Sequence, residues 1–100
     1  MSPPRSKPIM ELLDLLGRRW TLRLLWELRT PVASFRDLQS RCGDMSSSVL
    51  SQRLGELREA GVVVSLSAGG YELSAEGREL VEVLLPLNEW SKAWAKRRGR

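Results

Sequence analysis

Histidine and cysteine, two residue types that often carry out catalysis, are almost absent from this sequence. It contains no histidine and a single cysteine, Cys42. Zinc sites built from cysteine and histidine, Ser-His-Asp triads and Cys-His pairs all need residues that the chain lacks. These absences argue against most hydrolases, and we expect no enzymatic activity, no metal site and no cofactor.

The chemistry that the sequence does favour is recognition of a polyanion by one short segment. Residues 46–53, Ser-Ser-Ser-Val-Leu-Ser-Gln-Arg, contain no acid, and acidic side chains return only at Glu56. If this segment is a helix with its leucines facing a core, a rotation of about 100° per residue turns Ser48, Ser51 and Gln52 outward. Hydroxyl and amide groups near a helix N-terminus suit phosphate oxygens and base edges. The alternative is an ordinary capped surface helix.

Arginines beside this segment are further candidates for phosphate contacts. Arg36 is expected on the first turn of the preceding helix, and Arg29 near the end of an earlier one. Arg53 lies nearer the flank of its helix than the exposed face. It either contacts a phosphate or pairs with an acid inside the protein, and the sequence favours neither role.

Both ends of the chain are basic. With 16 Lys and Arg against 12 Asp and Glu, the net charge is +4 and the isoelectric point is near 10.0. Residues 1–8 contain three prolines, which predicts a disordered or extended arm, and residues 96–100 form a basic tail. This distribution suits nucleic acid or an anionic membrane surface, although short charged termini are commonly just solvated.

The length of 100 residues fits one domain, for which we expect residues 9–95. No apolar run approaches the roughly 18 residues of a membrane helix, and no secretory segment follows Met1. A lone cysteine cannot form an internal disulfide, so we expect a soluble protein of the reducing cytoplasm. Apolar residues at helical spacing predict two helices, over about 9–16 and 20–28.

A helix-turn-helix is predicted next. It comprises a short helix, a turn containing glycine and a longer helix: residues 34–41, 42–45 and 46–60. Ser34 caps the first helix together with an acid three residues later, and either Ser46 or Ser47 caps the second. This arrangement favours the longer helix as the recognition element.

A small hairpin and a long helix complete the chain. Residues 62–66 are rich in β-branched side chains, residues 68–70 suit a turn, and residues 71–73 can pair back. Ser74 then caps a helix that Pro86 should kink or split in two. The fold class is therefore mostly α with a small β-hairpin, a winged helix-turn-helix with additional N- and C-terminal dimerisation helices.

Four segments have the residues of one known family: 15–21, 25–28, 48–61 and 71–80. On these segments, and above all on the run Val-Leu-Ser-Gln-Arg-Leu at 49–54, the chain resembles the HxlR family of bacterial transcriptional regulators, in the MarR-like superfamily. The resemblance implies a winged helix that binds double-stranded DNA.

The chain departs from the family pattern in its charged positions. The resemblance implies a proline at Ser47 and often a basic residue at Ser48, so the recognition helix offers less charge than usual. The segment between the strands is also short, and residues 65–70 contain no Lys or Arg. Such a wing lacks a cation for the minor groove, and the sequence leaves open both a purely structural role and contact with DNA.

The cysteine position of the family also differs. Many related proteins carry a reactive cysteine at the start of the first helix, where this chain has Ser6 or Lys7. Cys42 lies instead in the turn of the helix-turn-helix, where we expect a small buried hydrophobe. A reactive thiol beside Arg41 is the alternative.

Two apolar stripes exceed what one small core can bury, and we expect them to form a dimer interface. They comprise Ile9, Leu12, Leu13 and Leu16 in the first helix and Leu87, Trp90 and Trp94 in the last. The four tryptophans, which include Trp20 and Trp26, could instead wall a pocket for a small apolar effector. Aromatic residues at helical spacing more often lie in a core or an interface.

These features predict a bacterial homodimer that represses transcription from a pseudo-palindromic operator, in the cytoplasm and on the nucleoid when bound, with no membrane partner. The expected DNA contacts are Arg36, Ser46, Ser47, Ser48, Ser51, Gln52 and Arg53. The alternative is a winged-helix protein-interaction module without sequence-specific DNA binding, which the uncharged wing favours.

Overall fold

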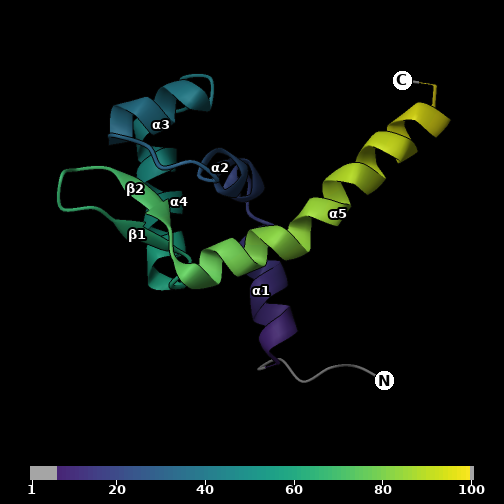
Figure 1. Ribbon diagram of the computed structural model, residues 1–100, viewed down its shortest axis with the longest axis horizontal. Coiled ribbons are helices and arrows are strands. Elements are labelled where there is room, and N and C mark those ends of the chain that lie inside the picture. Colours follow the sequence, from purple (N-terminus) through teal and green to yellow (C-terminus); the bar gives the residue numbers. More distant parts are fainter. Residues whose placement is uncertain (1–6, 100) are drawn as a thin grey trace.

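A computed structural model describes residues 7–99, which form five helices and one two-stranded hairpin (Figure 1). The elements are α1 (Pro8–Leu16), α2 (Thr21–Glu27), α3 (Phe35–Arg41), α4 (Ser47–Glu59), β1 (Val63–Ser65), β2 (Tyr71–Leu73) and α5 (Ala75–Arg97). This order confirms the predicted fold class of a winged helix-turn-helix. Most of the expected arm, residues 1–6, lies outside the described residues, and Pro8 already belongs to α1.

Serine side chains begin three of the helices. The hydroxyl oxygens of Ser34, Ser46 and Ser74 each accept a hydrogen bond from the backbone N–H three residues later, at 3.0, 3.3 and 3.0 Å. The carboxylate of Asp37 in turn accepts the N–H of Ala33 at 3.1 Å. The three serine bonds satisfy N–H groups that the first turn of a helix leaves unpaired. Ser46, rather than Ser47, is therefore the cap of α4.

The core lies where α2, α3, α4 and the hairpin meet. Its most buried side chains, below 2% exposed, include Leu24, Leu25, Leu28, Leu38, Leu50 and Leu57. Burying a leucine contributes about 2 kcal/mol, so the three inward leucines of α4 fix which face of that helix points outward. Within residues 7–99, no helix is both long enough and apolar enough to cross a bilayer.

The hairpin is attached to the body by a third backbone segment. β1 and β2 pair antiparallel, with Val63 opposite Leu73 and Ser65 opposite Tyr71. Tyr71 also exchanges two backbone hydrogen bonds of 3.0 Å with Val32, in the connection between α2 and α3. The wing is thus fixed to the helix-turn-helix, and its loop projects from the body on the side away from the C-terminal end of α5 (Figure 1).

A kink or a split was expected at Pro86, and the structure has one continuous helix of 23 residues, α5, so the helix is not split there. A proline inside a helix removes one hydrogen bond and tends to bend the helix, and α5 changes direction along its length (Figure 1). Its first half contacts α2 and β2, whereas its second half extends away from the body. Two residues of the expected basic tail, Lys96 and Arg97, belong to this helix.

Candidate nucleic-acid interface

The N-terminal half of α4 presents an acid-free polar face. Ser48, Ser51 and Gln52 are exposed, because Leu50 and the other leucines of this helix occupy the opposite, buried face. The hydroxyls of Ser46 and Ser48 lie 3.0 Å apart at the start of the helix. The first turn contains no acidic residue. No carboxylate of that turn therefore competes with a phosphate for the positive end of the helix dipole and the free N–H groups.

The turn before α4 is held by a side chain that the sequence did not single out. The amide nitrogen of Gln39, on α3, donates to the carbonyl of Met45 at 2.8 Å and to the hydroxyl of Ser47 at 3.1 Å. The backbone φ angles of Gly43 and Asp44 are +71° and +58°, which turn the chain sharply. Gln39 therefore fixes α4 relative to α3. Its amide at the turn-facing end of α3 was the only sequence signal for this role.

The two arginines expected to contact phosphates lie in different surroundings. Arg36 is exposed on the first turn of α3, and it has no ion-pair partner in the part of the chain that the structure describes. Arg29 lies over the ring of Trp26, with its guanidinium carbon 3.4 Å from the ring centroid, and donates to the Trp26 carbonyl at 3.0 Å. Arg36 is therefore the arginine better placed to reach a phosphate.

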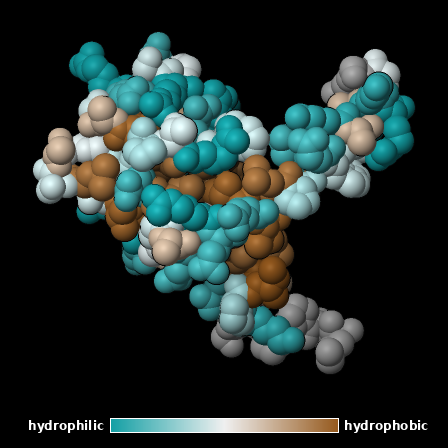
Figure 2. Space-filling model, in the orientation of Figure 1, coloured by the Kyte–Doolittle hydropathy of each residue, from teal (hydrophilic) through white to brown (hydrophobic). Residues whose placement is uncertain are grey.

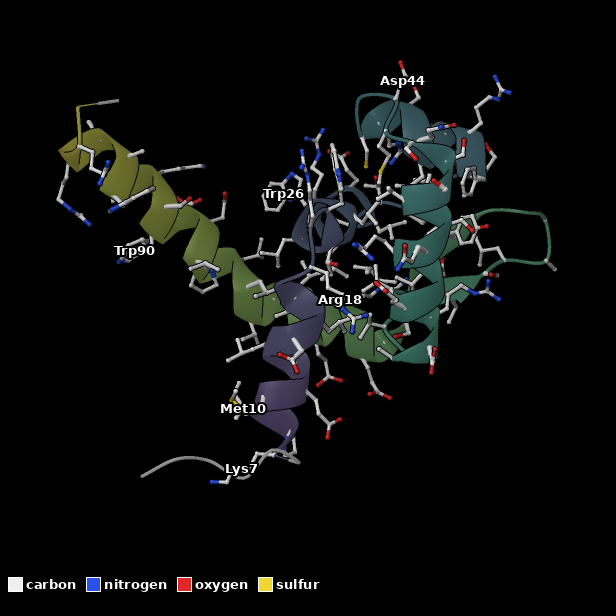
Figure 3. The ribbon with its side chains drawn as sticks, turned by 180° about the vertical axis from the view of Figure 1, so that it is seen from behind. Lys7, Met10, Arg18, Trp26, Asp44 and Trp90 are labelled. Atoms are coloured by element: carbon white, nitrogen blue, oxygen red, sulfur yellow. The ribbon has the colours of Figure 1, made fainter. Side chains whose placement is uncertain are left out.

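Arg53 forms an internal pair, one of the two roles expected for it. Its Nη1 lies 3.0 and 3.2 Å from the two carboxylate oxygens of Glu56, and its Nε donates to the carbonyl of Arg19 at 2.8 Å. Only 17% of the side chain is exposed. Glu56 also forms an ion pair of 3.0 Å with Arg18, which lies between α1 and α4 (Figure 3). The Arg53 guanidinium thus lies on the flank of α4, against the protein.

Cys42 is a buried core residue, 1% exposed. Burial raises the pKa of its thiol, and the nearby charge of Arg23 offsets only part of that rise. The neighbouring Arg41 does not activate the thiol, since its guanidinium is bonded to Thr30 and Asp37. A thiol that stays protonated and covered is a poor nucleophile. The environment of Cys42 is that of a packing residue.

The residues expected at a dimer interface divide into exposed and half-buried groups. The exposed ones are Ile9, Leu13, Leu87, Trp90 and Trp94, between 41% and 56% exposed. Leu12 is half-buried, and Leu16 packs against the core. Hydrophobic surface extends over α1 and between α2 and α5 (Figure 2), and Trp90 lies on the part of α5 beyond the body (Figure 3).

The four tryptophans do not wall a common pocket in the described part of the chain. Trp90 and Trp94 stack on each other, with ring centroids 6.0 Å apart. Trp26 lines a hollow of about 420 Å³ between α2 and α5, whose other lining side chains are mainly apolar. Trp20 lies beside a separate hollow at the start of α2 and packs partly against the core.

Residues 15–99 match the sequence pattern of the HxlR-like helix-turn-helix family. The HTH-type transcriptional regulator YvaP of Bacillus subtilis is 28% identical over 90 residues, which cover 81% of either chain. An HTH-type transcriptional regulator of Methanocaldococcus jannaschii is 26% identical over 90 residues, or 85% of this chain and 83% of the relative. Both relatives are matched over most of their length.

Solved structures show the same fold. Quinone-bound YodB from Bacillus subtilis is 27% identical and aligns with a TM-score of 0.76 over 87% of this chain and 98% of its own. A possible HxlR family transcriptional factor from Thermoplasma volcanium is 26% identical, with a TM-score of 0.77 over 90% of this chain and 86% of its own. The arrangement of helices and wing is therefore shared across these proteins.

Proposed function

Because the chain belongs to the HxlR-like helix-turn-helix family of transcriptional regulators, we propose that it represses transcription as a homodimer on a pseudo-palindromic operator. The observation that carries this proposal is the exposed, acid-free N-terminal half of α4. That half enters the major groove of double-stranded DNA. Base contacts come from Ser48, Ser51 and Gln52, and phosphate contacts come from Ser46, Ser47 and Arg36.

The homodimer is supported by apolar surface that the protomer leaves uncovered. The side chains of Ile9 and Leu13 on α1 and of Leu87 and Trp90 on α5 are each more than half exposed. Apolar patches of this kind mark interfaces, and a two-fold axis makes the same patch complementary to itself. Pairing through α1 and the second half of α5 presents two copies of α4 to successive major grooves, about 34 Å apart.

Selection of DNA from a random pool of duplexes tests this proposal. We expect the wild-type chain to enrich two inverted half-sites with centres about 10 base pairs apart. A promoter that carries the enriched sequence should then be less active in the presence of the protein. If no duplex binds above background, the chain is instead a protein-interaction module, as residues 65–70, which lack a cation, would favour.

The proposal includes a small apolar effector in the hollow between α2 and α5. Its volume of about 420 Å³ lies in the range of ligand pockets, and Trp26 offers an aromatic wall. Anilinonaphthalene sulfonate, a fluorescent apolar probe, should bind the wild type and bind Trp26→Ala at least threefold more weakly. Equal binding to both proteins would remove this hollow as the effector site.

A further inference from the structure

One carboxylate connects α4 to the corner between α1 and α2. The two oxygens of Glu56 lie 3.0 Å from Nη1 of Arg53 and 3.0 Å from Nη1 of Arg18. Arg53 also donates from Nε to the carbonyl of Arg19 at 2.8 Å. These bonds connect Arg18, Glu56, Arg53 and the carbonyl of Arg19, and so link the corner at residues 17–20 to the middle of α4. In Figure 3, Arg18 lies between α1 and α4.

The corner is a place where the backbone needs support. Trp20 has a φ of +80°, in the left-handed region that residues with a side chain rarely adopt. Such a conformation persists only where the surroundings hold it. The Trp20 ring packs against the core, and the Arg53 guanidinium holds the carbonyl of Arg19, immediately before it. The position of the corner and the position of α4 therefore depend on each other.

Within residues 7–99, the Arg53–Glu56 pair is the most shielded ion pair, whereas Arg18, at the outer side of the network, is 45% exposed. The side chains of Arg53 and Glu56 are 17% and 21% exposed, whereas the Lys92–Glu89 pair on α5 is 67% and 72% exposed. Exposed pairs of that kind contribute little, but shielded charges bonded to several groups hold a fixed geometry. The outward residues Ser51 and Gln52 lie within one turn of this support. A small rotation of α4 would displace them from their bases, because readout tolerates about 0.5 Å of misplacement.

We propose that Glu56 is a positioning residue for DNA reading and that it acts through Arg53 and Arg18. The network sets the orientation of α4 relative to the corner at residues 17–20. Arg53 supports that helix instead of contacting a phosphate. This inference rests on the proposed DNA-binding function. It adds that three residues with no DNA contact determine how well the exposed residues of α4 discriminate between sequences.

The test compares Glu56→Gln with Glu59→Gln, a matched variant on the same helix. Both remove one negative charge, but Glu59 is exposed and lies outside the network. The probes are a duplex that the wild type selects from a random pool and a mixed-sequence duplex of the same length. We expect Glu56→Gln to bind the selected duplex about tenfold more weakly and the mixed duplex as well as the wild type does. If charge alone mattered, both variants would bind DNA more tightly than the wild type, because each carries one negative charge fewer.

Three further single variants and one double variant separate positioning from folding and from phosphate contact. Arg18→Ala should weaken selected-duplex binding as Glu56→Gln does, and the double variant should lose no more than the larger single loss. Arg36→Ala should lower the slope of log affinity against log salt by about 0.9, whereas Arg53→Ala should leave the slope unchanged. Thermal melting of each variant is measured alongside, because a purely stabilising role lowers Tm without changing the affinity of folded protein.

The outcomes are distinct. Equal behaviour of Glu56→Gln and Glu59→Gln would overturn the positioning role, as would a lowered salt slope in Arg53→Ala. If Glu56→Gln does not fold, Arg18→Ala, a change at a half-exposed side chain, decides the same question. Failure of the wild type to bind any duplex would instead remove the proposed function, and with it this inference.

Discussion

The carbonyl oxygen of Val62 occupies the space that a side chain at Gly77 would need. The same oxygen accepts the N–H of Ser74 at 3.0 Å, so the first turn of α5 lies directly on the chain segment that leads into β1. Only glycine permits this approach of two backbones. The wing and the long helix are thereby packed as one unit.

Gly77→Ala should therefore destabilise the protein, by about 1–3 kcal/mol, because the added Cβ forces the backbone of α5 away from Val62. Gly55→Ala is the matched control in another helix. A Cβ at Gly55 meets no atom, so that change should stabilise the protein by about 0.5–1 kcal/mol. Urea unfolding at one fixed protein concentration measures both. A shift in the same direction for the two variants would contradict this account.

Cys42 should behave as an inert thiol. Because burial raises its pKa, the thiol stays protonated at pH values where an ordinary cysteine has begun to ionise. Iodoacetamide should alkylate it slowly at pH 8 and faster only as the pH rises further or the protein unfolds. Diamide or peroxide should leave DNA affinity unchanged in the wild type and in Cys42→Ala. Loss of binding on oxidation in the wild type alone would show a redox role.

The wild-type protein should be a dimer in solution. Sedimentation at micromolar concentration should give a single species of twice the chain mass of 11.3 kDa. Leu87→Glu should shift this species to the monomer, because it places a charge in the proposed interface. Val64→Glu, which adds the same charge at another exposed apolar site, should not. A stable, soluble wild-type monomer would exclude the dimer and the two-half-site mechanism.

Gln52 and the basic C-terminus should contribute to DNA binding in different ways. Gln52→Ala should cost about 1–3 kcal/mol at one base pair in each half-site and barely change the salt dependence. Truncation after Trp94 removes Lys96, Arg97, Arg98 and Arg100. It should weaken binding to all sequences alike and flatten the salt dependence. Intact specific binding in both Gln52→Ala and Ser48→Ala would refute the assignment of α4 as the recognition helix.

The features that the sequence predicts well are those that depend on neighbours along the chain. A serine cap such as Ser34 needs only the N–H three residues later, and the outward direction of Ser51 follows from the leucines of the same helix. The order of the elements and the bounds of the hairpin follow in the same way, from local spacing and turn residues. Local patterns were therefore enough to identify the exposed face of α4.

Contacts between distant segments could not be predicted in this way. The pairing of Tyr71 with Val32, and of Arg53 with the carbonyl of Arg19, joins residues more than 30 positions apart. Each depends on the final packing of several elements. The angular position of Arg53 left its phosphate and internal roles equally open, because only the corner beside α4 supplies the partners. The helix through Pro86 likewise stays intact at a position where sequence alone allowed a break.

Because the second half of α5 extends beyond the body, its side chains are under a different evolutionary constraint from those of the core. The side chains of Leu87 and Trp90 are more than half exposed and lie outside the core cluster, so substitutions there disturb the core of the protomer less than substitutions of its buried leucines. The exposed polar face of α4 does not involve these side chains either. In the proposed dimer, substitutions on this half of α5 would therefore decide which related chains pair, while the proposed DNA contacts on α4 stay the same. Mixed dimers would then be avoided without any change to the proposed DNA-reading face of α4.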